Sequence, residues 1–483
     1  MNVPFLLVAI LPPVLLTGLL WTSAWGTVRP IEVLLTLPMV LLPWASFVAW
    51  RRESEERFPL FALVGGMFWI YYGLPVFRIA WTGEPTIPYE TLVPALLLSD
   101  LGLVCLWCGF RLAPFRSPVS ARVPEIAGTP SQLAYVRGVL VVGALLGLSE
   151  SHAYVFGEGG RNAILLLGDF VPLVAVAYLL RRHLSGQGQR IDVIFLAVYA
   201  VLRVMAALAS GWLGSAVGFG IVLVIVYLEE RRRVPVGLVV AVLAYTLVLQ
   251  PAKTAFREVF WYGGEQGSRL ERLAFWARAS QAEWESAAAG EGGKTPSELA
   301  AETLSRMSLL EHSALIIEMT PDVVPYQHGR LYSYFLVTLV PRVLWPDKPS
   351  INEANRFYQV AYGLTPEWHL DSISIACGFV GEAYINFGWL GVPFVVTLVG
   401  MALRWFERNL LEPGNGNLLR AIGVPVVSLF LILESQLAQY FGGLLQRIAL
   451  ALLVFLPVWR LTPRALPDAS EPGADEGVEA PLE

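Results

Sequence analysis

Long apolar runs alternate with short polar connections over most of the chain. A helix needs about 20 mostly apolar residues to cross the hydrocarbon core of a bilayer, so this pattern predicts an all-α membrane protein with about 12 transmembrane helices. The predicted spans lie near residues 4–24, 31–50, 59–79, 91–110, 133–150, 162–180, 191–209, 212–228, 234–251, 379–403, 420–437 and 441–459.

Arginine residues are spread unevenly among the connections between these runs. Basic clusters fall at every second connection, and the short connections between them hold few basic residues. Because cytoplasmic loops carry an excess of Lys and Arg, the alternation predicts that both termini are cytoplasmic. The clusters are Arg51/Arg52/Arg57, Arg111/Arg116/Arg122, Arg181/Arg182/Arg190, Arg231/Arg232/Arg233, Arg404/Arg408/Arg420 and Arg460/Arg464.

This orientation divides the chain into four parts. Residues 1–251 form an N-terminal membrane bundle of about nine spans, and residues 373–460 a C-terminal bundle of about three. Between them, residues 252–372 form one large loop on the outer face. Residues 461–483 are acidic and rich in Pro and Gly, which is typical of a disordered tail.

The large loop carries signals of folded helices. Residues 268–285 mix Leu, Ala and Trp with Arg and Glu, which indicates an amphipathic helix at the membrane interface. Thr295, Pro296 and Glu298 form a capping box that is typical of a helix start. Apolar residues follow at helical spacing as far as Pro321, and they predict one helix over that stretch.

The apolar segment 331–345 leaves two alternatives open. It is short, and Pro341 and Arg342 interrupt it. A full span here would place the later arginine clusters outside, against the usual charge distribution. We therefore favour a re-entrant or interfacial segment buried against protein.

Composition supports the membrane class and adds little chemistry. Hydrophobic residues make up 55% of the chain and charged residues only 15%, which is unusual for a soluble domain. Cys105 and Cys108 lie inside an apolar run and Cys377 is alone, so we expect neither a zinc site nor a disulfide framework. The sequence predicts no metal, no cofactor and no nucleic-acid partner.

The densest polar cluster of the sequence covers residues 326–386. At a membrane face, Arg binds phosphate groups through a planar fork and Lys binds them as a point charge. Arg342 and Lys348 lie in the segment 341–349, where three prolines would hold both in fixed positions. An equally good interpretation is a Pro-rich interfacial turn, with Trp345 as membrane anchor and Arg342 reaching toward the headgroups.

Glu382 is the second polar signal, because it lies at the outer end of the tenth predicted span. A charged side chain in hydrocarbon costs about 2.5–3.5 kcal/mol even on lenient scales, so an ionisable residue here suggests function. Asn386 follows one helical turn later on the same face. A structural ion pair between Glu382 and an arginine such as Arg342 is at least as good an interpretation.

Two segments of this region carry a family resemblance. PRVLWPDKP at residues 341–349, followed by GEAYINFGWLGVPF at residues 381–394, resembles the oligosaccharide repeat-unit polymerases, the Wzy-type O-antigen polymerases of bacteria. The plan of many spans and one large outer loop is similar too. The resemblance implies a GT-C-like inner-membrane enzyme that joins undecaprenyl-diphosphate-linked oligosaccharides at the periplasmic face, with a chain-length regulator as a candidate partner beside the membrane lipids.

The chemistry that the resemblance implies needs cations at the leaving diphosphate and a base for the acceptor hydroxyl. Matching the motif positions gives Arg342 and Lys348 as the main diphosphate-binding candidates and Glu382 as the first candidate base. The full set of candidates comprises Arg342, Lys348, Arg330 and Arg356 for substrate binding and Glu382, Asp371 and His328 for catalysis.

Two other functions fit the same sequence. An O-antigen ligase-like transferase would use the same donor with a different acceptor. A transporter or flippase of lipid-linked oligosaccharides would show internal repeats and broken helices near the bilayer midplane. We find no clear repeat between the two halves, and the polar cluster lies at the outer face, so the sequence favours an enzyme.

Overall fold

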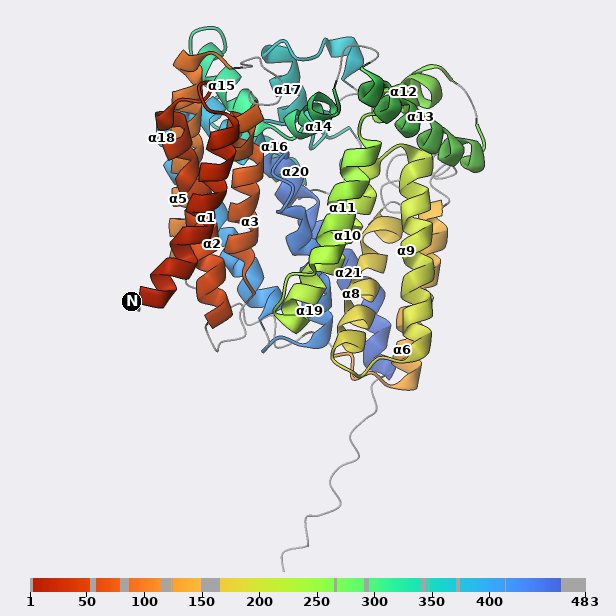
Figure 1. Cartoon of the computed structure of the whole chain (residues 1–483). Coiled ribbons are helices and arrows are strands. Elements are labelled where there is room, and N and C mark those ends of the chain that lie inside the picture. The colour runs from red at the N-terminus through yellow and green to blue at the C-terminus, as the bar shows by residue number, and fades with distance from the viewer. Residues whose placement is uncertain are drawn as a thin grey trace, which may run out of the picture.

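The chain folds into a bundle of long helices with a layer of short helices across one end (Figure 1). The computed structural model describes residues 3–52, 58–78, 87–113, 123, 125–148, 166–264, 267–290, 295–338, 340, 345, 347–370, 374–412 and 414–461. These residues form helices and turns with no strand among them, which confirms the predicted all-α class. Eight helices within the described ranges are long and apolar enough to cross a membrane, or nine if the bent pair α11–α12 is one span.

Every predicted apolar run overlaps a helix of the bundle. These helices are α1 (Val3–Ser23), α2 (Pro30–Arg52), α3 (Leu60–Phe68, continued by η1, Trp69–Gly73, and η2, Leu74–Arg78), α5 (Tyr89–Leu112), α6 (Pro130–Leu148), α8 (Val171–Leu184), α9 (Arg190–Ser210), α10 (Leu213–Arg231), α11 (Val236–Leu249), α18 (Gly378–Phe406, continued by η8, Glu407–Leu411), α19 (Asn417–Leu429), α20 (Leu437–Gly442) and α21 (Leu444–Phe455, continued by η9, Leu456–Leu461).

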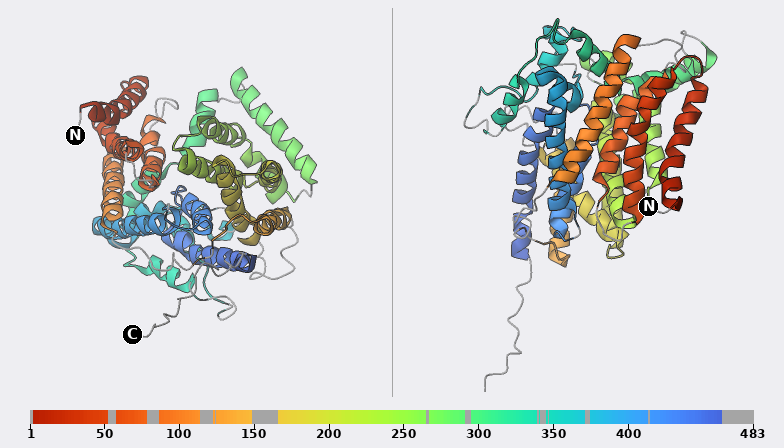
Figure 2. Two further views of the ribbon diagram at one scale, coloured as in Figure 1. Left: turned by 90° about the horizontal axis from the view of Figure 1, so that it is seen from below. Right: turned by 90° about the vertical axis from the view of Figure 1, so that its left-hand side faces the viewer.

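The long helices pack in two groups that stand side by side (Figure 2). One group contains α1, α2, α3, α5 and α18, and the other contains α6, α8, α9, α10, α11, α19 and α21. One continuous core of buried side chains runs through both groups. The short helix α20 and the loop helix α16 (Arg330–Thr338) contact each other in the space between the groups.

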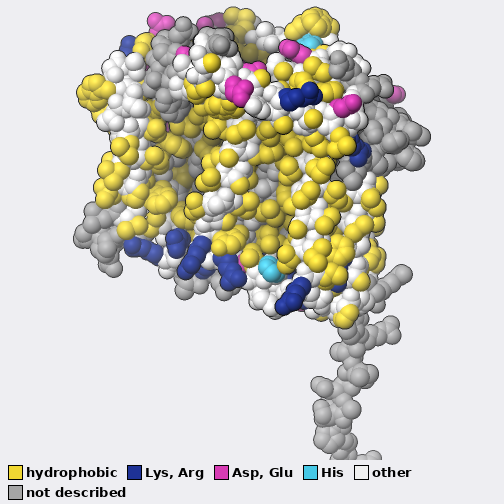
Figure 3. Space-filling model, turned by 45° about the vertical axis from the view of Figure 1, so that its right-hand side comes forward, with side chains coloured by type: hydrophobic (Ala, Val, Ile, Leu, Met, Phe, Trp, Pro, Cys, Tyr) yellow, Lys and Arg dark blue, Asp and Glu magenta, His cyan; other side chains and the backbone are white. Residues whose placement is uncertain are grey.

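The two ends of the bundle differ in charge. Helices α2, α5, α8, α10 and α18 carry arginines in their last turns, at Arg52, Arg111, Arg181, Arg231 and Arg404. Figure 3 shows a broad hydrophobic band with a row of Lys and Arg side chains along its lower edge. We call this edge the arginine end and the opposite end, which α12 to α17 cover, the loop end (Figure 1). Arg57, Arg116, Arg122, Arg464 and the predicted tail beyond residue 461 lie outside the described residues.

The loop end is built from α12 (Lys253–Arg257), η5 (Glu258–Tyr262), α13 (Arg269–Ala289), α14 (Pro296–Ser305), α15 (Leu309–Met319), α16, α17 (Glu353–Ala361) and η7 (Glu367–His369). Both predicted helix starts are confirmed, because Ser268 and Thr295 cap α13 and α14 with complete capping boxes. The single helix expected from Thr295 to Pro321 is wrong. It is two helices, because Ser308 accepts a hydrogen bond from Glu311 N and starts α15 anew.

Helix α16 covers residues 331–338 of the segment 331–345, and the other described residues of that segment, 340 and 345, are not helical. The nine residues of α16 rise about 14 Å, less than half of the hydrocarbon thickness of a bilayer. It packs against α17 and α20 at the loop end. The described part of this segment is therefore too short to cross a membrane by itself.

Helices α5 and α18 form the largest contact between two helices of the described chain. Two glycines allow their backbones to approach closely. A Cβ atom on Gly109 would lie 1.9 Å from the Thr397 carbonyl oxygen, and a Cβ atom on Gly400 would lie 2.2 Å from the Leu106 carbonyl oxygen. Small residues are the usual means of close helix approach in membranes.

We expect Gly400→Ala to lower the stability of the purified protein by about 1–3 kcal/mol, because the added methyl group forces two backbones apart. Gly66→Ala is the matched control, since a Cβ atom at Gly66 of α3 meets nothing within 4 Å and alanine favours a helix. Thermal unfolding in detergent should show a lower midpoint for Gly400→Ala alone. Equal midpoints for the two variants would contradict the close approach.

Candidate functional site

Helix α18 is broken at Gly388, near the loop end. This residue has φ +64° and ψ −152°, and a Cβ atom here would lie 2.9 Å from the Tyr326 hydroxyl, so the position requires glycine. The carbonyls of Ile385 and Asn386 lie directly before this break. They accept hydrogen bonds of 3.0 and 2.9 Å from the backbone N–H groups of Gln327 and His328. The loop before α16 therefore completes the broken helix.

His328, one of the predicted catalytic residues, is part of this connection. Its backbone is left-handed, with φ +48°, and its side chain is exposed. The next residue, Gly329, donates its N–H to Asn386 Oδ1 at 3.0 Å, and Asn386 Nδ2 donates to the Glu382 carbonyl at 2.9 Å. His328 is thus linked through Asn386 to the backbone of Glu382.

Glu382, the first predicted base, has no exposed surface. Its Oε2 atom accepts a 2.7 Å hydrogen bond from the N–H of Leu437, the first residue of α20. Its Oε1 atom has no hydrogen-bond partner among the described residues. The carboxylate therefore holds the start of α20 against α18. A general base must reach the proton that it abstracts, and Glu382 is enclosed in this arrangement.

The predicted substrate-binding residues make local contacts. Lys348 is 9% exposed, and its Nζ donates to the carbonyls of Val337 and Val340 at 3.4 and 2.7 Å, which stabilises the end of α16. Arg356 pairs with Glu353 on its own helix at 3.4 Å. Arg330 is exposed at the start of α16, whereas Arg342 and the predicted catalytic Asp371 lie outside the described residues.

A different set of charges converges at the loop end. Helix α12 follows α11 after a bend of 65°, and Lys253 and Arg257 lie one turn apart on α12. Arg306, at the end of α14, donates from Nη2 to Thr254 Oγ1 at 3.2 Å and so joins α14 to α12. The charges of Arg257, Arg306 and Glu434 all act on Lys253. We call Lys253, Arg257 and Arg306 the loop-end cation cluster.

Glu434 faces this cluster from the non-helical segment between α19 and α20. The side chains of Glu434 and Lys253 make no hydrogen bond or ion pair with another residue in the described ranges. Arg306 also lies 3.8 Å from Glu302. The three cations of the cluster outnumber the two carboxylates beside them, Glu302 and Glu434, so an excess of positive charge remains. A partly buried cation without a close anion is unfavourable, so the cluster is suited to an anionic ligand.

Sequence reasoning missed the cation cluster. The one local signal was the pair Lys253 and Arg257, which lie four residues apart directly after the ninth apolar run and would therefore share one face of a helix. Arg306 and Glu434 lie far away in the chain, and only the fold brings them to α12.

His312 on α15 is a buried titratable group of the loop end. Burial lowers the pKa of its imidazole to about 4. Its Nδ1 atom lies 2.8 Å from the Tyr358 hydroxyl, which connects α15 to α17. The side chain is therefore neutral at pH 7 and adds no charge to the cation cluster.

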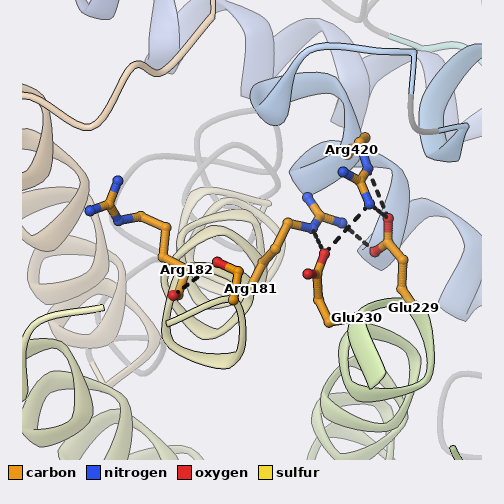
Figure 4. A network of polar contacts seen from close by, with 6 residues as sticks. Arg181, Arg182, Glu229, Glu230 and Arg420 are labelled. Atoms are coloured by element: carbon orange, nitrogen blue, oxygen red, sulfur yellow. Dashed lines mark hydrogen bonds and ion pairs between the residues drawn. The ribbon is translucent and has the colours of Figure 1, made fainter. Parts of the chain in front are cut away.

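The arginine end contains a buried ion network of its own (Figure 4). Arg420 of α19 binds Glu229 of α10, with 2.6 Å between Nη2 and Oε1, and Arg181 of α8 binds Glu230, with 3.0 Å between Nε and Oε1. Arg181 also pairs with Glu229. Arg182 points away from the acidic pair (Figure 4). The network joins three helices through buried ion pairs, so we assign it to stability.

No group of three or more His, Cys, Asp or Glu side chains suited to a metal ion occurs within the described ranges. No curated protein and no solved structure matches this chain. One family model matches residues 164–411, which is more than half of the 483 residues. The matched stretch runs from the start of α8 through the loop end to the end of η8, and so includes the cation cluster. The chain belongs to the family described as a domain of unknown function, DUF8712.

Proposed function

We propose that this chain is a glycosyltransferase of the bacterial inner membrane that joins lipid-diphosphate-linked oligosaccharides into a polysaccharide. The observation that carries the proposal is the loop-end cation cluster facing Glu434 beside a sharp helix bend. Such a cluster suits a diphosphate, because this group presents several anionic oxygens at the membrane surface. The resemblance of the segments at 341–349 and 381–394 to the Wzy-type polymerases points to the same class of substrate.

In the proposed reaction, a hydroxyl of the acceptor sugar attacks the anomeric carbon of the donor sugar. The bond between that carbon and the diphosphate oxygen breaks, and its electron pair leaves with undecaprenyl diphosphate. The cation cluster stabilises the charge that develops on the leaving oxygen. Glu434 takes the proton of the hydroxyl as general base, in place of the enclosed Glu382.

The proposal includes about 12 spans, cytoplasmic termini and a periplasmic loop end in a GT-C-like arrangement. The shorter apolar helices α1 and α19 support this number together with the longer spans and the bent pair. The arginines gathered at the opposite end support the orientation. Undecaprenyl-diphosphate-linked oligosaccharides, membrane lipids and a chain-length regulator are the proposed partners.

Purified protein in proteoliposomes tests the activity directly. The substrate is the single lipid-linked repeat unit that accumulates in a strain lacking this gene. We expect lipid-linked products of two or more units together with free undecaprenyl diphosphate, both measured by mass spectrometry. If the substrate is intact and accessible but no lengthened product forms, the proposal is contradicted. If a single unit is transferred to a different acceptor without lengthening, the reaction is the ligase-like one instead.

A transporter of the same lipid-linked oligosaccharide is the second candidate. In the part of the chain that the structure describes, helices are interrupted at the α11–α12 bend, at Gly388 of α18 and at residues 430–436 between α19 and α20. Interrupted helices line the substrate sites of many transporters. In sealed vesicles, a transporter would move the intact unit from one leaflet to the other and leave its length unchanged.

A further inference from the structure

A cavity of about 550 Å³ lies between the loop-end halves of α6 and α9 and the start of α13. Most of its lining is apolar or small, with Leu202, Met205, Ala206 and Ala209 on α9. Gly147 lines the cavity from α6. This space is separate from the cation cluster, because none of Lys253, Arg257, Arg306 and Glu434 lines it.

The cavity borders the apolar outer surface of α9. Met205 lines the cavity and is 39% exposed, and Ile194 and Val201 on the same helix are 62% and 59% exposed. A second, smaller hollow shares Gly147, Leu202 and Ala206 with the cavity and continues it along α6 and α9. An apolar groove on a lipid-facing helix is filled by hydrocarbon in a bilayer rather than by water.

Two arginines line the same cavity from the first turn of α13. Arg269 and Arg272 are three residues apart and therefore lie on neighbouring positions of the helix surface. Arg272 is held in place because its Nε and Nη1 donate to the carbonyls of Gly267 and Ala209 at 3.2 and 3.1 Å. The nearby carboxylate of Glu271 accepts the Ser268 N–H at 2.6 Å as part of the helix cap.

Helix α13 has the features of a helix at headgroup depth. Leu270 is 73% exposed beside the two arginines, and the remainder of the helix alternates charged and apolar residues. The Trp284 indole donates to the Val248 carbonyl at 3.2 Å and fixes α13 against the end of α11. The groove therefore offers an apolar channel to a hydrocarbon chain and two cations at the level of its headgroup.

We propose that this groove binds one phospholipid with an anionic headgroup from the surrounding leaflet. One acyl chain lies between α6 and α9, and the phosphate contacts Arg269 and Arg272 through charge-assisted hydrogen bonds. The two arginines provide charge complementarity, and bilayer phospholipid is in large excess at this surface. This site is independent of the proposed transferase reaction.

Native mass spectrometry of the full chain tests the proposal. The protein is released from nanodiscs of phosphatidylcholine with 20% phosphatidylglycerol (about one lipid in five). We expect one retained phosphatidylglycerol per protein. The double substitution Arg269→Ala with Arg272→Ala should lower the retained fraction about tenfold. Arg278→Ala is the matched control, because Arg278 is an exposed arginine of the same helix outside the groove.

A second variant tests the apolar part of the site. Ala206→Phe fills the groove and should also remove the lipid, whereas Val201→Phe adds the same ring to the exposed face of α9 outside the cavity and should retain it. Retention of phosphatidylglycerol by both the arginine double variant and Ala206→Phe would overturn the proposal. Retention of phosphatidylcholine alone, or of a lipid diphosphate, by the wild-type protein would overturn it as well.

Discussion

Lys253→Met should lower the rate of chain lengthening by about 10²–10³-fold while the protein still accumulates in the membrane. Methionine keeps an unbranched side chain of similar length and removes the charge. Lys253 is the residue of the cluster on which Arg257, Arg306 and Glu434 all act, so its loss removes one of the three positive charges proposed to stabilise the leaving group. The initial rate of product formation in proteoliposomes, normalised to protein amount, measures the effect.

Arg278→Met is the matched control for this experiment. Arg278 is exposed on α13 at the same end of the molecule, so its substitution removes one positive charge from outside the cluster. We expect this variant to retain nearly the full rate. If Lys253→Met and Arg278→Met lengthen chains equally well, the cluster does not bind the diphosphate.

Glu229→Gln should destabilise the protein by about 3–5 kcal/mol, because it leaves Arg181 and Arg420 partly uncompensated in a buried network. Three helices, α8, α10 and α19, are joined at this point. We expect a markedly lower thermal midpoint in detergent and less folded protein in the membrane fraction. Fluorescence-detected size-exclusion chromatography after heating measures both.

Glu283→Gln provides the comparison for Glu229→Gln. Glu283 is an exposed carboxylate on α13, and exposed charges contribute about 0–1 kcal/mol to stability. Its variant should unfold at the wild-type temperature. A Glu229→Gln protein as stable as this control would show that the network contributes little net free energy.

The long apolar helices and the helix caps could be predicted from sequence because both are local properties. Backbone groups in hydrocarbon must be paired within their own segment, so a long apolar run is nearly obliged to be helical. The capping boxes at Ser268 and Thr295 involve residues only three positions apart. The split between α14 and α15 was missed because Ser308 provides a cap without a box and the apolar spacing continues across it.

The candidate site could not be predicted in the same way, because its contacts join distant parts of the chain. Residue type suggested a basic group of the large loop as the binding group for a phosphate, and it pointed to Lys348. That side chain stabilises the end of α16, whereas Lys253 follows a 65° bend and is acted on by the charges of Arg306 and Glu434. From the sequence, Glu382 in its apolar run could be either a catalytic base or a structural residue. The structure shows that its carboxylate accepts a hydrogen bond from the Leu437 N–H.

The close approach at Gly109 and Gly400 bears on what the family boundary means. The matched stretch, residues 164–411, includes α18 but not α5, its largest packing partner. It also stops before Leu437 and Glu434. A fragment cut at those limits would keep Gly400 but lose α5, so the face of α18 that packs closely against α5 would be left exposed to lipid.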